Sequence, residues 1–218
     1  MRFLSCRSFQ FVLCALLMHS GGTASAQLVL EKGDHIAIIG NALADHMQHD
    51  GWLETCLHLA YPDKELVIRN LGFAGDTVAK RPRNENFMSA DDYLTHVGAD
   101  VVFAFFGYNE SYERNPEKFK QELHAFIDAT REQRYNGETA PVIVLFSPIA
   151  HENLNTPNLP DGVENNLWLS IYTDAMARVA QEKGVLFVDL FAPSKRLYED
   201  RAAPLTLNGV HLNAAGNR

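Results

Sequence analysis

The sequence predicts an α/β fold in which a five-stranded parallel sheet forms the middle layer of a doubly wound, three-layer sandwich. Short apolar runs of strand length alternate with longer amphipathic stretches, a pattern typical of βαβ units. Runs such as VVFAFF at 101–106 are apolar at every position, so both faces of the sheet need cover. The chain has 218 residues, of which 46% are hydrophobic, and this is sufficient for one well-buried domain.

Each element has its own signal. The segments predicted as strands are 35–39, 65–70, 101–106, 141–146 and 185–190. The segments predicted as helices are 42–60, 91–97, 116–135 and 164–183. Pro116 suits the first turn of a helix and Gly184 suits the position after a helix end, so these two residues delimit the last two helices.

The residues that follow the predicted strands are unusually polar. In open parallel sheets, ligands bind outside the carboxyl ends of the strands, so these segments form the predicted site. They read GNAL at 40–43, GFAGD at 72–76, GYNE at 107–110 and SPIAHE at 147–152, with NGVH at 208–211 near the end. The long irregular segment 151–163 is expected to act as a lid or a binding wall.

The N-terminal residues resemble an export signal. Arg2 and Arg7 precede an apolar run at 11–18, and Ala24-Ser25-Ala26 follows a short spacer, which is the three-part pattern of a secretory signal peptide. The apolar run is far shorter than the roughly 20 residues that a spanning helix needs. We therefore expect cleavage after Ala26, a secreted or periplasmic protein and no membrane span. The alternative interpretation is a buried N-terminal helix.

Composition limits the partners. Cleavage would remove Cys6 and Cys14 and leave Cys56 alone, which excludes an internal disulfide in the mature chain. The formal net charge is −8 at pH 7, and loss of Arg2 and Arg7 makes it two units more negative. A surface of this sign disfavours nucleic acid and anionic membranes, so a small-molecule partner is expected.

Four of the polar segments, in order and in spacing, resemble the sequence blocks of the SGNH or GDSL hydrolases, a family of esterases and acyl hydrolases with a flavodoxin-like sheet. Gly-Asp-Ser-Leu of the family corresponds to residues 40–43, and its second-block glycine corresponds to Gly75. Its Gly-x-Asn-Asp corresponds to residues 107–110, and its Asp-x-x-His corresponds to residues 208–211. The resemblance covers nearly all of the chain after residue 26.

This resemblance implies a role for each matched position. His211 would be the base, while the Asn109 amide and the backbone N–H groups of Gly75 and residue 42 would bind an oxyanion. The nucleophile position holds Ala42 and the acid position holds Asn208, so neither the hydroxyl nor the carboxylate of a triad is present. Because no serine lies between Ser25 and Ser89, the covalent serine route is expected to be closed.

Other residues after the strands are candidates for ligand contact. Asn41 belongs to the first block, and Tyr108 in the third block is expected to stack on a sugar or a flat acyl group. His151 and Glu152 would orient substrate or activate water, or alternatively cap nearby backbone. His46 and His49 have a helical i, i+3 spacing that suits a shared metal, but a polar helix face is the more ordinary interpretation, and no metal or cofactor is expected.

The leading hypothesis is an exported ester hydrolase domain that acts on O-acyl groups of glycans. Its rival is a non-catalytic domain that binds carbohydrate or carboxylate in the same crevice, and a third hypothesis is hydrolysis by water activated by His211 or Glu152. Residues 213–216 look like a helix start, so we expect a domain at 27–218 that is truncated before its final helix, either as a fragment or as the first domain of a longer polypeptide.

Overall fold

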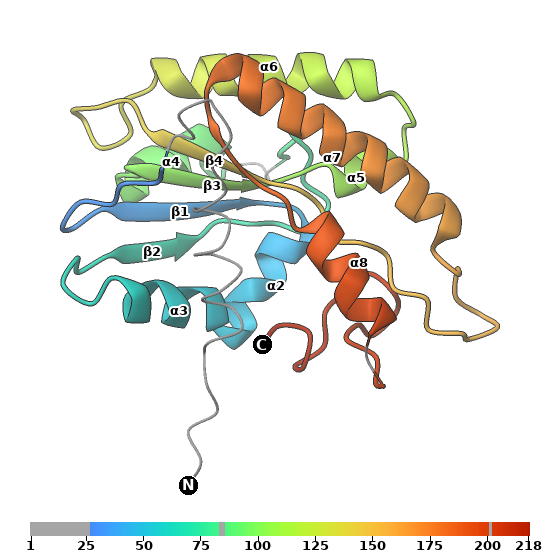
Figure 1. Cartoon of the computed structure of the whole chain (residues 1–218). Helices are drawn as coiled ribbons and strands as arrows, with labels where there is room; N and C mark the ends of the chain where they lie inside the picture. The colour runs from blue at the N-terminus through green and yellow to red at the C-terminus, as the bar shows by residue number, and fades with distance from the viewer. Residues whose placement is uncertain (1–26, 83–85, 201) are drawn as a thin grey trace, which may run out of the picture.

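The computed structural model describes residues 27–82, 86–200 and 202–218, and its centre is a five-stranded parallel sheet (Figure 1). The strand order is β2-β1-β3-β4-β5, the flavodoxin-like order of a doubly wound sheet. The predicted fold class is confirmed. The strands are β1 (His35–Gly40), β2 (Val67–Asn70), β3 (Val101–Phe105), β4 (Val142–Phe146) and β5 (Leu186–Val188).

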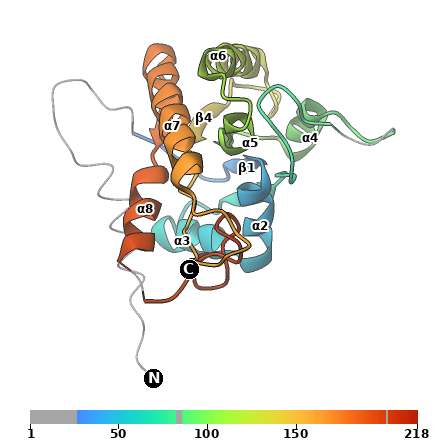
Figure 2. The same ribbon diagram turned by 90° about the vertical axis from the view of Figure 1, so that its right-hand side faces the viewer.

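Helices cover both faces of the sheet, and together they form the two outer layers (Figure 1). One face packs against α4 (Ala90–Val97), α6 (Pro116–Glu132) and α7 (Val163–Lys183). The other face packs against α2 (Ala42–Asp50) and α3 (Trp52–Ala60). Two further helices, α5 (Tyr108–Ser111) and α8 (Phe191–Glu199), lie near the carboxyl ends of the strands (Figure 2).

Strand β3 shows why its sequence is apolar throughout. Val102 and Ala104 face the core beneath α6 and α7, whereas Val101, Phe103 and Phe105 face the core above α2 and α3. All five residues are at most 2% exposed. Since successive side chains of a strand point to opposite faces, a strand covered on both faces needs apolar residues at every position.

Several predicted boundaries were wrong, for local reasons. The helix predicted at 42–60 is two helices, because Gly51 adopts φ 61 and ends α2 in the left-handed region. Strand β2 begins at Val67 instead of residue 65, since Glu65 has φ 50, which is incompatible with extended backbone. Strand β5 has three residues, α6 ends at Glu132, and residues 213–216 form a turn.

Strands β1 and β3 are neighbours, and the chain leaves them in opposite directions, towards α2 on one face and α5 and α6 on the other. This is the topological switch point at which such sheets bind ligands. The two strand ends approach closely, because Gly40 has φ 137 and a Cβ there would overlap the carbonyl of Phe105. The Asn41 N–H donates to that carbonyl at 3.2 Å, which fixes the start of α2 beside β3.

The segment expected to be a signal peptide, residues 1–26, lies outside the described residues. In the part of the chain that the structure describes, no helix combines the length and the apolar character needed to cross a bilayer.

Candidate functional site

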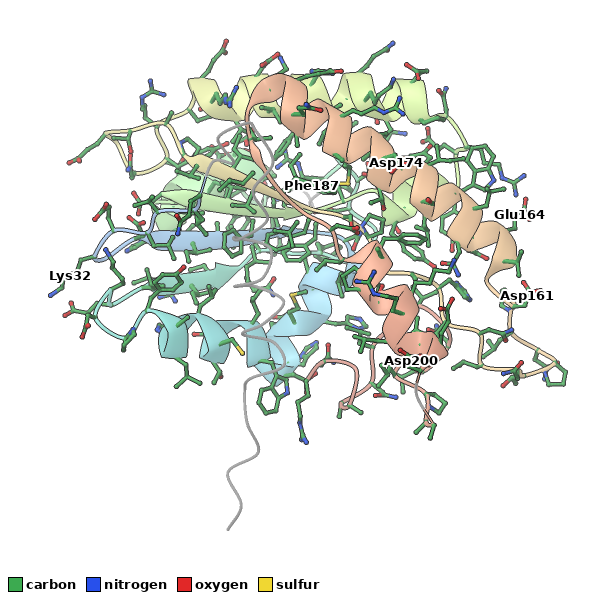
Figure 3. The ribbon with its side chains drawn as sticks, in the orientation of Figure 1. Lys32, Asp161, Glu164, Asp174, Phe187 and Asp200 are labelled. Atoms are coloured by element: carbon green, nitrogen blue, oxygen red, sulfur yellow. The ribbon has the colours of Figure 1, made fainter. Side chains whose placement is uncertain are left out.

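A pocket of about 310 Å³ opens at the switch point, at the carboxyl ends of β1, β3 and β4. Figure 2 views this side, where the segment after β4 and the C-terminal segment lie between α2 and α8. In Figure 3, Lys32 marks the opposite edge of the sheet, and Asp161, Glu164 and Asp200 lie on the side of the pocket. Among the residues predicted from the sequence, those that line it are Asn41, Ala42, Tyr108, Asn109, Asn208 and His211.

The N-terminus of α2 forms one wall. Asn41 is its N-cap, and its Oδ1 accepts from the N–H of Leu43 at 3.1 Å, so this oxygen stabilises the helix. Ala42 is the first helical residue and lines the pocket with its methyl group. The backbone N–H groups of a first helical turn lack intrahelical partners and form a partly positive end, which suits a carbonyl oxygen or an anion.

Short helix α5 forms a second wall, and hydrogen bonds tie it to the loop after β2. Asn109 lines the pocket while its Nδ2 donates to the carbonyl of Asp76 at 2.9 Å. The buried carboxylate of Glu110 accepts from the N–H groups of Val78 and Gly107, each at 2.8 Å. Burial raises the pKa of Glu110, although these backbone donors oppose the rise. The amide of Asn109 has a second hydrogen, which is free to serve a ligand.

Gly75 lies in the same loop but is not part of the pocket lining. It is exposed and has φ 94 in a turn closed by the hydrogen bond from Asp76 N–H to the Phe73 carbonyl. Asn109 contacts this loop at the next residue, through the hydrogen bond from its Nδ2 to the Asp76 carbonyl. Convergence of the Gly75, Ala42 and Asn109 donors on one oxyanion stays a prediction.

The C-terminal segment contributes His211 and Asn208. Oδ1 of Asn208 accepts from the backbone N–H groups of Val210 at 3.2 Å and His211 at 3.0 Å. This side chain therefore shapes the turn that presents the imidazole. Burial is the main cause that lowers the pKa of His211, and the neighbouring His46 lowers it further. His211 is consequently neutral near pH 7, the form in which an imidazole accepts a proton.

His46, which the sequence analysis interpreted as part of a polar helix face, lines the pocket. Its ring stacks on that of His211, with centroids 4.9 Å apart and an interplanar angle of 28°. His46 follows Ala42 by one helical turn, and this i, i+4 spacing was the available signal that both face the same side. The predicted partner, His49, is exposed and its ring centroid lies 6.1 Å from that of His46.

Two aromatic residues of α5 and its C-terminus, Tyr108 and Tyr112, line the pocket. Tyr108 is 9% exposed, and its hydroxyl lies 3.3 Å from Nδ1 of His151, so its ring supports the wall. Burial raises its pKa far above the ordinary value. Tyr112, one turn further along, also lines the pocket and is 62% exposed. The aromatic face that can contact a ligand is therefore that of Tyr112.

His151 and Glu152 were expected in the crevice, and the structure corrects this placement. Both are buried, and neither lines the pocket. The Glu152 carboxylate accepts from the N–H of Leu205 and from the N–H and hydroxyl of Thr206 at 2.6 to 3.0 Å. Glu152 thus caps nearby backbone, the alternative the sequence had left open, whereas the ring of His151 lies against the Tyr108 hydroxyl. Through Glu152, the start of segment 151–163 is bonded to the C-terminal segment.

The one serine in the lining, Ser147, is not an alternative nucleophile. Its Oγ accepts from the N–H groups of Leu190 at 2.8 Å and Phe191 at 3.1 Å. It also lies 3.1 Å from the carbonyl of Pro148, to which it donates. With 1% exposure, this hydroxyl joins the ends of β4 and β5 and has no remaining capacity to attack a ligand.

None of the described residues that line the pocket is Asp, Glu, Lys or Arg. Its polar groups are amides and imidazoles, supplied chiefly by Asn109, Asn208, Asn217, His46 and His211. Across residues 27–82, 86–200 and 202–218, no three His, Cys, Asp or Glu side chains are grouped in a way that could hold a metal ion. The pocket is thus suited to a neutral ligand with hydrogen-bonding groups.

Comparison with known proteins identifies a family that the chain matches. The sequence pattern of the GDSL-like Lipase/Acylhydrolase family matches residues 33–218. No curated protein matches the chain.

Solved structures share the fold at low sequence identity. LAE5, an alpha/beta hydrolase enzyme from the metagenome of Lake Arreo, Spain, is 22% identical with a TM-score of 0.63, over 86% of this chain and 91% of LAE5. A catalytic mutant of Axe2, an acetylxylan esterase from Geobacillus stearothermophilus, is 16% identical with a TM-score of 0.65, over 87% and 91% of the two chains. BT4096, a gut microbial diltiazem-metabolizing enzyme, is 18% identical with a TM-score of 0.64, over 88% of this chain and 46% of BT4096.

Proposed function

Because this chain belongs to the GDSL-like lipase/acylhydrolase family, we propose that its pocket binds a small acyl ester and hydrolyses it by direct attack of water, with His211 as the base. The observation that carries this proposal is the placement of His211, Asn109 and the N-terminus of α2 around one pocket. A methyl group at Ala42 leaves the base without a hydroxyl to deprotonate, so water is the available nucleophile.

The proposed reaction has two steps. His211 takes a proton from water as the water oxygen bonds to the ester carbonyl carbon, and the carbonyl oxygen becomes an oxyanion. The Asn109 amide and the backbone N–H of Ala42 stabilise that oxyanion. The C–O bond to the alcohol then breaks, the imidazolium returns its proton to the leaving alkoxide, and a carboxylic acid and an alcohol result. No covalent acyl intermediate forms on the protein.

The rate of this reaction is expected to be low. Loss of a serine nucleophile costs about 10⁶ in turnover where it has been measured, and an oxyanion site alone provides roughly 10³ over water. Asn208 adds to the loss, because an amide cannot offset the charge of an imidazolium beside it.

The second candidate function is binding without hydrolysis, and Asn208 specifically favours it. Its side-chain oxygen is committed to the backbone of residues 210 and 211, so His211 has no carboxylate to stabilise its cation. In this case the pocket holds an acylated or hydroxyl-rich ligand through amides and imidazoles alone.

For the ligand, we propose an O-acylated glycan. The uncharged lining suits a neutral sugar, and the exposed ring of Tyr112 offers a surface on which a sugar ring can stack. The acetylxylan esterase among the structural neighbours acts on such a glycan, which agrees with this choice. Export after cleavage at Ala26 would bring the protein to extracellular glycans, and mass spectrometry of the mature protein should find Gln27 at its N-terminus.

The deciding experiment compares the wild-type protein with His211→Ala. Hydrolysis of p-nitrophenyl acetate that is slow, shows no burst and falls to the solvent background in His211→Ala supports water attack. Calorimetric binding of acetylated xylo-oligosaccharide without product release supports the binding function. Hydrolysis that is unchanged in His211→Ala would contradict the proposed role of the imidazole.

A further inference from the structure

The acid position of the family does not serve the imidazole in this chain. Oδ1 of Asn208 is occupied by two backbone N–H groups, and an amide carries no charge. Yet a base needs a neighbour that fixes its ring, because an imidazole free to rotate presents its nitrogen atoms in the wrong direction. The neighbour in contact with the ring of His211 is His46, on α2.

We propose that His46 takes the place of residue 208 as the partner of His211, a positioning residue that holds the imidazole by ring stacking and keeps it uncharged. The centroid distance of 4.9 Å and the tilt of 28° fall within the range for offset-stacked aromatic rings. Both rings line the pocket, and His46 stands one helical turn from Ala42, so the pair faces the position of the missing hydroxyl. This inference rests on the proposed role of His211 as the base.

Electrostatics give the pair its second property. Two imidazolium ions in contact would repel each other, so the binding of one proton by the pair disfavours the binding of a second proton. The lowering of the pKa of His211 by His46 has this cause and adds to the larger lowering by burial. A conventional aspartate would act in the opposite direction and favour the imidazolium. The pair is therefore suited to accepting a hydrogen bond or a proton, and poorly suited to retaining a positive charge.

The surroundings contain little that would counter this effect. The other titratable groups in the described lining are Tyr108 and Tyr112, neither of which is a carboxylic acid or an amine. On α2, Asp45 is bonded to Gln48 and to the backbone of Ala74. The other titratable groups of α2 are Asp50, which is bonded to Asn217, and the exposed His49.

The test is an NMR titration of the histidine Hε1 resonances in four proteins: wild type, His46→Gln, His46→Phe and His49→Gln. His46→Gln removes the charge and the ring, and the pKa of His211 should rise. His46→Phe removes the charge but keeps a ring, so the pKa should rise while the ring-current shift of His211 persists. His49→Gln changes an exposed histidine on the same helix and should leave His211 as in wild type.

The outcomes separate this inference from the proposed function. A pKa of His211 that is the same in wild type and in both His46 variants would overturn the pairing, as would an equal change in His49→Gln. If the pKa rises as expected but no protein hydrolyses p-nitrophenyl acetate, the pairing stands and the proposed hydrolysis fails. His46→Phe keeps an aromatic ring in the wall and provides the answer even if the glutamine variant does not fold.

Discussion

Placing a serine at position 42 and an aspartate at position 208 should strongly raise esterase activity. The change is Ala42→Ser with Asn208→Asp, made together. The serine Oγ would project from the first residue of α2 into the pocket that His211 also lines. The aspartate would keep the hydrogen bonds from the N–H groups of Val210 and His211, because a carboxylate oxygen accepts as an amide oxygen does, and its charge would stabilise the imidazolium.

The size of the gain follows from what the site retains and what it lacks. A complete triad is worth about 10⁶ in turnover. The parent and the double variant have the same oxyanion donors, so the contribution of those donors cancels in the comparison. The double variant should therefore exceed the parent by up to about 10⁶. Each single variant should stay within about tenfold of the parent, since triad residues act as a unit.

The assay is the initial rate of p-nitrophenyl acetate hydrolysis by the four proteins, with folding checked by circular dichroism. A burst of p-nitrophenol and an acetyl group on residue 42, located by mass spectrometry, should appear in the double variant alone. Addition of His211→Ala to the double variant is the matched control and should return the rate to that of the parent. A folded double variant no faster than the parent would refute the assigned geometry and favour a pocket that serves binding.

Three further predictions concern stability. Glu152→Gln places an amide NH₂ among backbone donors and should lower the free energy of unfolding, measured by urea denaturation, by about 2 to 4 kcal/mol. An unchanged denaturation midpoint would contradict the role of Glu152 as an anchor. Gly209→Ala should lower the free energy of unfolding by about 3 kcal/mol, because Gly209 has φ 88 and a Cβ there would overlap the buried imidazole of His151. Gly137→Ala is the control: Gly137 has φ 82 but open space around it, so the loss should be about 1 kcal/mol. Equal losses in the two variants would show that backbone strain alone acts. Burial lowers the pKa values of His151 and His211, so the unfolded chain binds protons at these histidines before the folded chain does. The free energy of unfolding should therefore fall as the pH drops below about 6.5. His211→Gln should reduce that fall, and a dependence of stability on pH equal to that of wild type would contradict the assignment.

Much of the fold could be predicted because its signals are local. The segments that form β3 and β4 are apolar throughout, and this composition predicts their burial. Pro116 and Gly184 mark a helix start and a helix end. The break at Gly51 also had a visible cause, yet the continuous amphipathic pattern around it outweighed a single glycine in the interpretation. Parallel topology then follows from the alternation of strands and helices.

Of the candidate site, the sequence by itself determined which chemistry is absent: Ala42 has no hydroxyl and Asn208 no carboxylate, whatever the fold. It also predicted that Asn109 and His211, which belong to the polar segments 107–110 and 208–211, lie at one edge of the sheet. Only the tertiary structure decided what each group contacts. His46 meets His211 across 165 positions of sequence, Glu152 turns inward to residues 205 and 206, and Gly75 lies outside the pocket lining. Residue type is local, but the neighbours that give a side chain its protonation state, its hydrogen bonds and its exposure come from distant segments that only the folded core brings together.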